Sequence, residues 1–188
     1  IRRQRQMCIR DSFGADEYVI TCASSKTSIA LAFVAKQRGL KKIIGITSEK
    51  NRSFTNSLDC YDEVLTYDEV KTISNAQKIM IVDMAGHYDA MKDLHEHFGD
   101  HVKYSCKVGA THLDNLEGDM SQLPGAKPTF FFAPTQAQKR TEEWGAGEVQ
   151  KRIGMSLKDF QIHSDQWLNV NRGSGMIEIK ETFKDTVQ

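Results

Sequence analysis

A polar turn near the start of the chain carries the residues best suited to bind an anion. It lies between a short apolar run and a stretch with helical periodicity, and consists of Ser24, Ser25, Lys26 and Thr27. A helix N-terminus presents unpaired N–H groups and a partial positive charge, so a lysine and three hydroxyls there predict a seat for a phosphate group. The alternative is that Ser24 or Ser25 only caps the helix. The turn contains no glycine, so neither common glycine-rich phosphate motif is present.

A second set of polar and small residues follows two later strand-like runs. The set consists of Asp83, Ala85, Gly86, Gly109, Thr111 and His112. Because parallel strands end at the same edge of a sheet, we expect this set to line a ligand pocket, with His112 as a proton donor. The alternative is that Asp83 hydrogen-bonds loop amides and His112 is an ordinary polar loop residue.

These residues need strands and helices to position them, and the chain supplies both in alternation. Strand-like runs begin at Tyr18 and then occupy Lys42–Ile46, Glu63–Thr66, Lys78–Asp83, Val102–Val108 and Thr129–Phe132. Helical patterns cover Thr27–Arg38, Asn51–Leu58 and a stretch whose apolar face carries His87, Met91, Leu94 and Phe98. The alternation predicts an α/β fold, a parallel sheet with helices on both faces. Gly39 and Gly99 are expected to end the first and third helices.

The pattern changes after the last strand-like run. Residues 113–128 contain glycines and prolines and predict a surface loop or lid. Beyond Pro134 the chain becomes helical, with an apolar stripe of Val149, Ile153, Leu157 and Phe160 bracketed by Trp144 and Trp167, which we interpret as packing residues. A final helical stretch puts Ile179, Phe183 and Val187 on one face.

The first residues look foreign to the rest of the chain. The run Arg2–Ser12 fits the translation of a transposon adapter used in sequencing libraries, so we predict that residues 1–12 are not native. The full chain has 25 basic and 25 acidic residues, and removing the run's four arginines and one aspartate leaves 21 against 24. We therefore expect no nucleic-acid partner and, without a long apolar run, no membrane partner.

Cysteine and histidine spacing gives no sign of a metal site. Cys22, Cys60 and Cys106 are far apart and form no C-x-x-C, which favours reduced thiols and a cytoplasmic protein. Among the histidines, His95 and His97 fall on different helix faces. We predict no bound metal.

Several short segments together carry a resemblance to a known family. The order of strand, polar turn and helix, with Ile44–Ser48, Leu58–Tyr67 and Val82–Gly86 after it, resembles the cofactor domain of medium-chain dehydrogenases and reductases, especially quinone-oxidoreductase-like members. A finer resemblance, over roughly residues 16 to 187, is to a branch defined only as a domain of unknown function. Its segments are Ala23–Thr27, Tyr61–Tyr67, Asp83–Gly86, Gly109–His112, Phe131–Pro134 and Trp144–Gly145.

This resemblance implies a Rossmann-like, doubly wound sheet that binds a nicotinamide dinucleotide, with the pyrophosphate over Ser24–Thr27 and the nicotinamide near the second set. Glu49 is the only acid in the loop after the second strand where such folds place an NAD-specific one. We expect NADP instead, with its 2′-phosphate bound by Thr47, Ser48, Lys50 and Arg52. If Glu49 turned inward, it would favour NAD.

The family also carries an N-terminal barrel domain that nothing here matches. We therefore expect a fragment, inactive alone, with residues 13–140 as the dinucleotide domain and 141–188 as a truncated helical segment packed on it. Two functions remain open. One is an NADP-dependent oxidoreductase for a small carbonyl or quinone-like substrate, and the other is a binding or scaffold module without dinucleotide turnover, which the glycine-free turn favours. We also expect a homodimer through Thr129–Phe132.

Overall fold

The structure is a computed structural model that describes residues 13–39, 42–84, 86–109, 120–170 and 173–187. The run predicted to be non-native lies outside these ranges, as do the candidate site residues Ala85, Thr111 and His112. The expected loop 113–128 is described from residue 120 onward. There a short 3₁₀ turn, η4 (Met120–Gln122), precedes the last strand.

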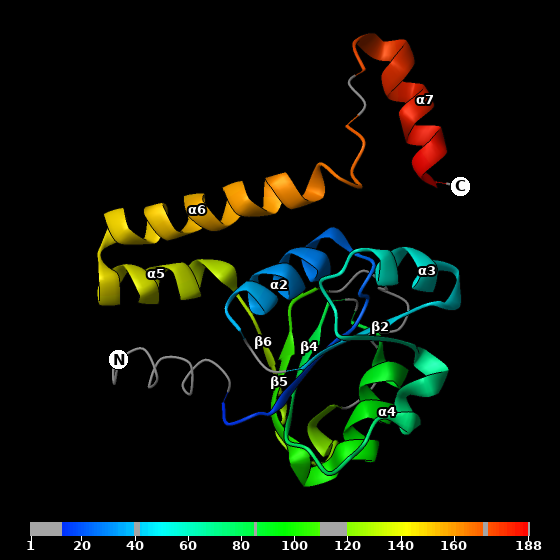
Figure 1. The fold of residues 1–188 in the computed structure, drawn as a ribbon, viewed down its shortest axis with the longest axis vertical. Coiled ribbons are helices and arrows are strands. Elements are labelled where there is room, and N and C mark those ends of the chain that lie inside the picture. The colour runs from blue at the N-terminus through cyan, green and yellow to red at the C-terminus, as the bar shows by residue number, and fades with distance from the viewer. Residues whose placement is uncertain (1–12, 40–41, 85, 110–119, 171–172, 188) are drawn as a thin grey trace.

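Six parallel strands form one sheet in the order β3-β2-β1-β4-β5-β6 (Figure 1). They are β1 (Glu17–Ile20), β2 (Ile43–Thr47), β3 (Glu63–Thr66), β4 (Ile79–Asp83), β5 (Val102–Lys107) and β6 (Pro128–Phe130). The expected α/β, Rossmann-like doubly wound fold is confirmed. The chain proceeds outward from β1 to β3, returns to the centre, and continues from β4 to the opposite edge.

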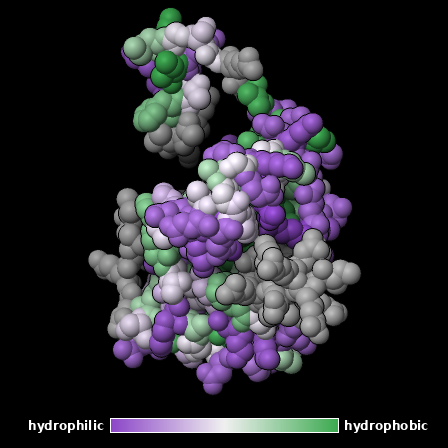
Figure 2. Space-filling view, turned by 90° about the vertical axis from the view of Figure 1, so that its left-hand side faces the viewer, coloured by the Kyte–Doolittle hydropathy of each residue, from purple (hydrophilic) through white to green (hydrophobic). Residues whose placement is uncertain are grey.

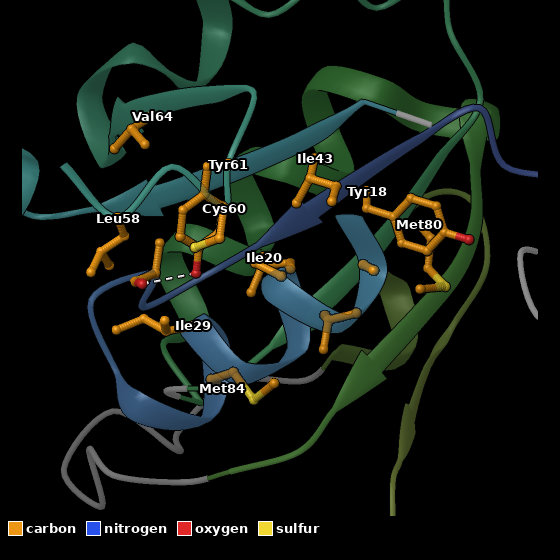
Figure 3. Packing of buried hydrophobic residues seen from close by; sticks show 14 of the residues in the cluster. Tyr18, Ile20, Ile29, Ile43, Leu58, Cys60, Tyr61, Val64, Met80 and Met84 are labelled. Carbon is orange, nitrogen blue, oxygen red and sulfur yellow. Dashed lines mark hydrogen bonds between the residues drawn. The ribbon is translucent and has the colours of Figure 1, made fainter. Parts of the chain in front are cut away.

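Each face of the sheet is covered because the central strands are apolar on both sides. On one face, α2 (Lys26–Gln37) packs Ile29 and Ala32 against Ile20, Ile43 and Met80 (Figure 3). On the other face, α4 (Tyr88–Phe98) packs its apolar stripe against the odd-numbered positions of β1 and β4. The remaining connections are α3 (Glu49–Ser57) and the 3₁₀ segments η1 (Tyr67–Thr72) and η2 (Gly99–His101).

Three helices follow the sheet: α5 (Ala133–Trp144), α6 (Ala146–Ser164) and α7 (Gly175–Val187). The predicted domain boundary at residue 140 falls inside α5. The α6 helix contacts α2 through aromatic stacking, with the rings of Phe33 and His163 4.6 Å apart. No helix in the described ranges is long and apolar enough to cross a membrane.

The apolar stripe predicted on α6 is only half used. Val149 is buried and Phe160 is packed against the core, but Ile153 and Leu157 are each 53% exposed. The interpretation of these two residues as packing residues is therefore wrong, because helical periodicity identifies an apolar face but not whether another element covers it. On α7, Ile179 and Phe183 are exposed too, and apolar side chains are visible at that end of the molecule (Figure 2).

His95, which the sequence did not mark as a core residue, connects α4 to β5 and to the segment before β6. His95 of α4 is fully buried, with Nδ1 2.8 Å from the Pro124 carbonyl oxygen and Nε2 2.9 Å from the Ser105 hydroxyl. A carbonyl only accepts, so Nδ1 carries the proton and Nε2 accepts from Ser105. Burial lowers the pKa of His95, and nearby Lys127 lowers it further, against a raising effect of the Pro124 contact.

We predict that protonation of His95 destabilises the fold in acid. Because its folded pKa lies below the unfolded value of 6.5, the free energy of unfolding is highest above pH 6.5 and falls as the pH drops through and below that value. Urea unfolding between pH 5 and 8 should show that the free energy of unfolding depends less on pH in His95→Gln than in the unsubstituted protein, called the parent below. The exposed His101→Gln serves as control, and equal slopes in all three proteins would contradict the assignment.

Candidate functional site

The carboxyl ends of β1 and β4 meet where the two halves of the sheet diverge. The two strands are neighbours, but the chain leaves them toward opposite edges. Open α/β sheets bind ligands in the crevice at such a switch point. The described candidate residues at the ends of β1, β2, β4 and β5 lie at this edge of the sheet, namely Ser24–Thr27, Thr47, Ser48, Lys50, Arg52, Asp83, Gly86 and Gly109.

The β1–α2 turn has an unusual backbone. Cys22 lies in the left-handed region with φ +51°, a conformation that costs a non-glycine residue roughly 1–2 kcal/mol. The Ala23 N–H donates to the Ile46 carbonyl at 2.9 Å, and the Ser25 N–H donates to the Cys22 carbonyl at 2.9 Å. The turn is therefore closed on itself and tied to β2 without any glycine.

The turn uses one serine as a cap and leaves other groups open. The Ser25 hydroxyl accepts from the Ser28 N–H at 3.2 Å, which confirms the capping role for this residue. The amides of Lys26 and Thr27 belong to the first turn of α2 and lack an intrahelical partner. Their side chains are exposed. The groups required to hold a phosphate therefore coexist with the cap.

Ser24 links the turn to the end of β2. Its hydroxyl is 3.3 Å from the Thr47 hydroxyl and accepts from the Asn51 side-chain amide at 3.1 Å. Thr47 is almost completely buried. Ser24 and Thr47 thus contact each other.

The loop after β2 divides its predicted phosphate ligands into two kinds. Ser48 and Lys50 are exposed, and Lys50 forms no ion pair with any described residue. Arg52 instead pairs with Glu69 at 3.0 Å and Glu49 at 3.5 Å. The second carboxyl oxygen of Glu69 accepts from the Thr66 N–H at 3.0 Å. Arg52 is thus already engaged, whereas Lys50 is available to a ligand.

Asp83 is fully buried and makes the loop contacts of the alternative interpretation. Its carboxyl group accepts from the Thr21 hydroxyl at 2.7 Å and from the Gly86 N–H at 3.1 Å. The Thr21 hydroxyl also accepts from the Met84 N–H at 3.1 Å. Asp83 therefore connects the ends of β1 and β4 and shapes the loop that follows β4.

Two glycines of the second set are needed for this loop geometry. Gly86 has φ +73°, which favours glycine, and is buried. A Cβ on Gly109 would lie 2.4 Å from the Met84 carbonyl oxygen. The loops after β4 and β5 therefore approach each other too closely for a larger residue at position 109.

Two tyrosines that the sequence analysis missed also contact the turn. Tyr61 donates its hydroxyl proton to the Ala23 carbonyl at 2.8 Å, and the Tyr67 hydroxyl accepts from the Cys22 N–H at 3.2 Å. The available signal was Gly45 inside an otherwise β-branched strand, since such glycines often mark close approach of another group. A Cβ at Gly45 would lie 2.8 Å from the Tyr61 ring.

Cys22 does not have the environment of a nucleophile. Burial raises the pKa of its thiol, and the nearby Asp83 raises it further. Burial also raises the pKa of Cys106 on β5. Both thiols are therefore protonated near neutral pH. Within the described ranges, no group of three histidine, cysteine or acidic side chains is placed to hold a metal ion.

A pocket of about 950 Å³ runs from the start of α2 down the same face of the sheet. Thr27 is among its lining residues, and its apolar lining includes Val34, Met80, Val82, Tyr104, Cys106 and Val108. Lys139 and Glu143 of α5 also line it. The candidate phosphate seat therefore adjoins a largely apolar pocket, which suits a ligand with an apolar body.

We predict that Thr21→Val destabilises the protein by about 1–3 kcal/mol, because it removes a hydroxyl that serves both Asp83 and the Met84 N–H while keeping the side-chain shape. Urea unfolding measures this loss. Thr129→Val is the control, since Thr129 is an exposed residue of the edge strand and its hydroxyl donates to the Ser105 carbonyl at 3.2 Å. Equal losses in the two variants would contradict the role given to Thr21.

The fold is similar to that of several solved oxidoreductases. A candidate NADPH:quinone reductase from Bacillus thuringiensis has a TM-score of 0.59 at 12% identity, covering 88% of this chain and 50% of that one. YhdH of E. coli K-12, solved with bound NADPH, has a TM-score of 0.53 at 14% identity, covering 74% and 45%. A mutant form of enoyl thioester reductase from Candida tropicalis has a TM-score of 0.55 at 10% identity, covering 84% and 46%.

The chain spans about half the length of these three proteins, and the low identities establish a shared fold. No curated protein matches the sequence significantly. A family profile matches residues 5–188. The match begins inside the run predicted to be non-native. Sequencing of the source gene tests that prediction. Because this match covers nearly the whole chain, the chain belongs to the family described as "Protein of unknown function (DUF2855)".

Proposed function

We propose that the chain is the NADP-binding part of an oxidoreductase of the medium-chain type that acts on a small carbonyl or quinone-like substrate. The observation that carries the proposal is the polar β1–α2 turn at the switch point of the sheet, where Ser24 to Thr27 meet the amino end of α2. This is the position at which a dinucleotide pyrophosphate gains most from helix amides.

The residues present fit a phosphorylated cofactor. Lys26 and the open amides of the first turn suit the pyrophosphate, while Lys50 and Ser48 suit a 2′-phosphate. Two proteins of similar fold are described with such a cofactor: YhdH with bound NADPH and an Etr1p variant with NADP and crotonyl-CoA. Because this chain spans only about half the length of the proteins that it matches, the activity of the whole protein is also part of the proposal.

When bound, the cofactor supplies or accepts a hydride. The contribution of this chain is to bind, orient and shield it. The α2 amides and Lys26 hold the pyrophosphate, and Lys50 selects the 2′-phosphate. Buried Asp83 keeps the loop after β4 in place, and the apolar pocket beside Thr27 excludes water from a substrate with an apolar body. A catalytic proton donor is not identified among these residues.

The second candidate is a binding or scaffold module without dinucleotide turnover. The observation that favours it is the strained, glycine-free turn, since Cys22 occupies a position where the side chain limits close approach of a pyrophosphate. Titration with dinucleotides separates the two candidates, because only the first requires NADPH binding. A cytoplasmic location is proposed with either, supported by the free thiols of Cys22, Cys60 and Cys106.

We predict that Lys50→Ala weakens NADPH binding by about 1.5–3 kcal/mol, the contribution of one hydrogen bond to a charged group, and leaves NADH binding unchanged. Arg52→Ala should have a smaller effect, because Glu69 already engages the guanidinium. Lys36→Ala is the matched control, since Lys36 lies at the far end of α2 and pairs with Asp59. Calorimetric titration of the parent protein decides, and equal losses for NADH and NADPH would refute the assignment.

We also propose a homodimer that pairs through Thr129–Phe132, which comprises the last two residues of β6 and the two residues that follow it. β6 lies at the edge of the sheet, and Phe130 and Phe132 are 71% and 55% exposed. An exposed apolar edge strand favours pairing with another chain. Light scattering should give a dimer for the parent and a monomer for Phe130→Asp, with the exposed α6 variant Ile153→Asp as control. A parent that stays monomeric across a wide concentration range would rule out the pairing.

A further inference from the structure

The backbone of the β1–α2 turn needs an explanation because no glycine supports it. Cys22 has φ +51°, which L-residues rarely adopt without help. Such a conformation persists only where its surroundings hold it. In this turn, the surrounding groups reach Cys22 and the next residue, Ala23, through hydrogen bonds.

Two tyrosines from the two ends of β3 reach this turn. Tyr61 precedes the strand and Tyr67 follows it. Tyr61 belongs to the core cluster on the α2 face, whereas Tyr67 packs against the cluster on the α4 face. They therefore approach the turn from opposite faces of the sheet, one donating to the Ala23 carbonyl and the other accepting from the Cys22 N–H.

Gly45 makes the first of these contacts possible. It lies in the middle of β2, the strand that separates β3 from β1. An added Cβ would be 2.8 Å from one carbon of the Tyr61 ring and 2.9 Å from the Ala23 Cβ. Both neighbours are buried, so neither has room to shift. The Tyr61 ring therefore occupies the space that a side chain at position 45 would need, and from there its hydroxyl donates to the turn (Figure 3).

We propose that Tyr61 and Tyr67 are positioning residues that hold the glycine-free turn in the conformation that receives the dinucleotide phosphate. The two hydroxyl groups fix the peptide groups on either side of the Cys22–Ala23 bond, and this sets the direction in which the turn enters α2. The inference rests on the proposed function, since it names the residues that prepare that same site.

The hydroxyl groups of both tyrosines keep their protons over a wide pH range, so their hydrogen bonds persist. Burial raises the pKa of the Tyr61 hydroxyl and that of the Tyr67 hydroxyl, so both stay protonated well above neutral pH. The Tyr67 ring also lies beside His87, with ring centroids 5.9 Å apart. Neither hydroxyl needs to ionise for the role described.

The test is a cycle of variants in the parent protein. Tyr67→Phe removes the acceptor of the Cys22 N–H and keeps the ring, while Cys22→Gly removes the backbone strain that the acceptor offsets. Tyr67→Phe should weaken NADPH binding about five- to tenfold, the effect of one hydrogen bond. In the Cys22→Gly background the same substitution should weaken it less than about twofold, because glycine adopts positive φ without support. Tyr61→Phe should weaken binding similarly.

The matched control is Tyr88→Phe, which removes a hydroxyl at the first position of α4 and should leave NADPH affinity unchanged. A purely structural role for Tyr67 would lower stability in urea but leave the affinity of the folded protein unchanged, and that result would overturn the proposal. Equal loss of affinity in the Cys22 and Cys22→Gly backgrounds would overturn it as well.

The same cycle separates this inference from the proposed function. If the parent protein binds no dinucleotide, the proposed function fails, and with it the role of the tyrosines in phosphate binding. The urea midpoints of the cofactor-free variants then still report the tyrosine contacts, since Tyr67→Phe should lower the midpoint less in the Cys22→Gly background. Identical shifts in both backgrounds would show that Tyr67 does not hold the turn.

Discussion

The buried hydrogen bond between Thr21 and Asp83 joins the two halves of the sheet where they diverge. Thr21 directly follows β1 and Asp83 ends β4, and both side chains are fully buried. A buried carboxyl group without partners is costly, so this contact fixes the two strand ends relative to each other. The turn that follows Thr21 and the loop that follows Asp83 inherit their positions from it. Ser24–Thr27 and Gly86 lie on these two segments, Thr47 contacts Ser24, and Gly109 lies close against the Met84 carbonyl.

The turn differs from glycine-rich phosphate turns in the position of the glycine that permits close packing. In those motifs the glycines sit in the turn itself. Here the turn holds Cys22 at positive φ, and the close approach occurs one strand away, at Gly45 under the Tyr61 ring. The turn can therefore be ordered without a glycine-rich motif, because the side chains of Tyr61 and Tyr67, which lie outside it, hold its backbone. Whether that turn accepts a pyrophosphate is a question about ligand approach, not about turn formation.

The sequence predicts the fold well because its signals are local. Strand runs rich in isoleucine and valine alternate with helices ended by Gly39 and Gly99, both at positive φ. Side-chain pairing is less predictable. The engagement of Arg52 with Glu69 joins residues that are 17 positions apart, and the Tyr61 contact to Ala23 spans 38. Neither follows from spacing along the chain. The burial of His95 depends on Ser105 and Pro124, which only the folded sheet brings beside it.

NADP binding at this glycine-free turn can be measured by calorimetric titration of the parent protein with NADPH and with NADH, under the same buffer and salt. We expect saturable one-site binding of NADPH and markedly weaker binding of NADH, because Lys50 meets a 2′-phosphate only in the first ligand. Absence of binding by either dinucleotide, or equal affinity for both, would contradict it.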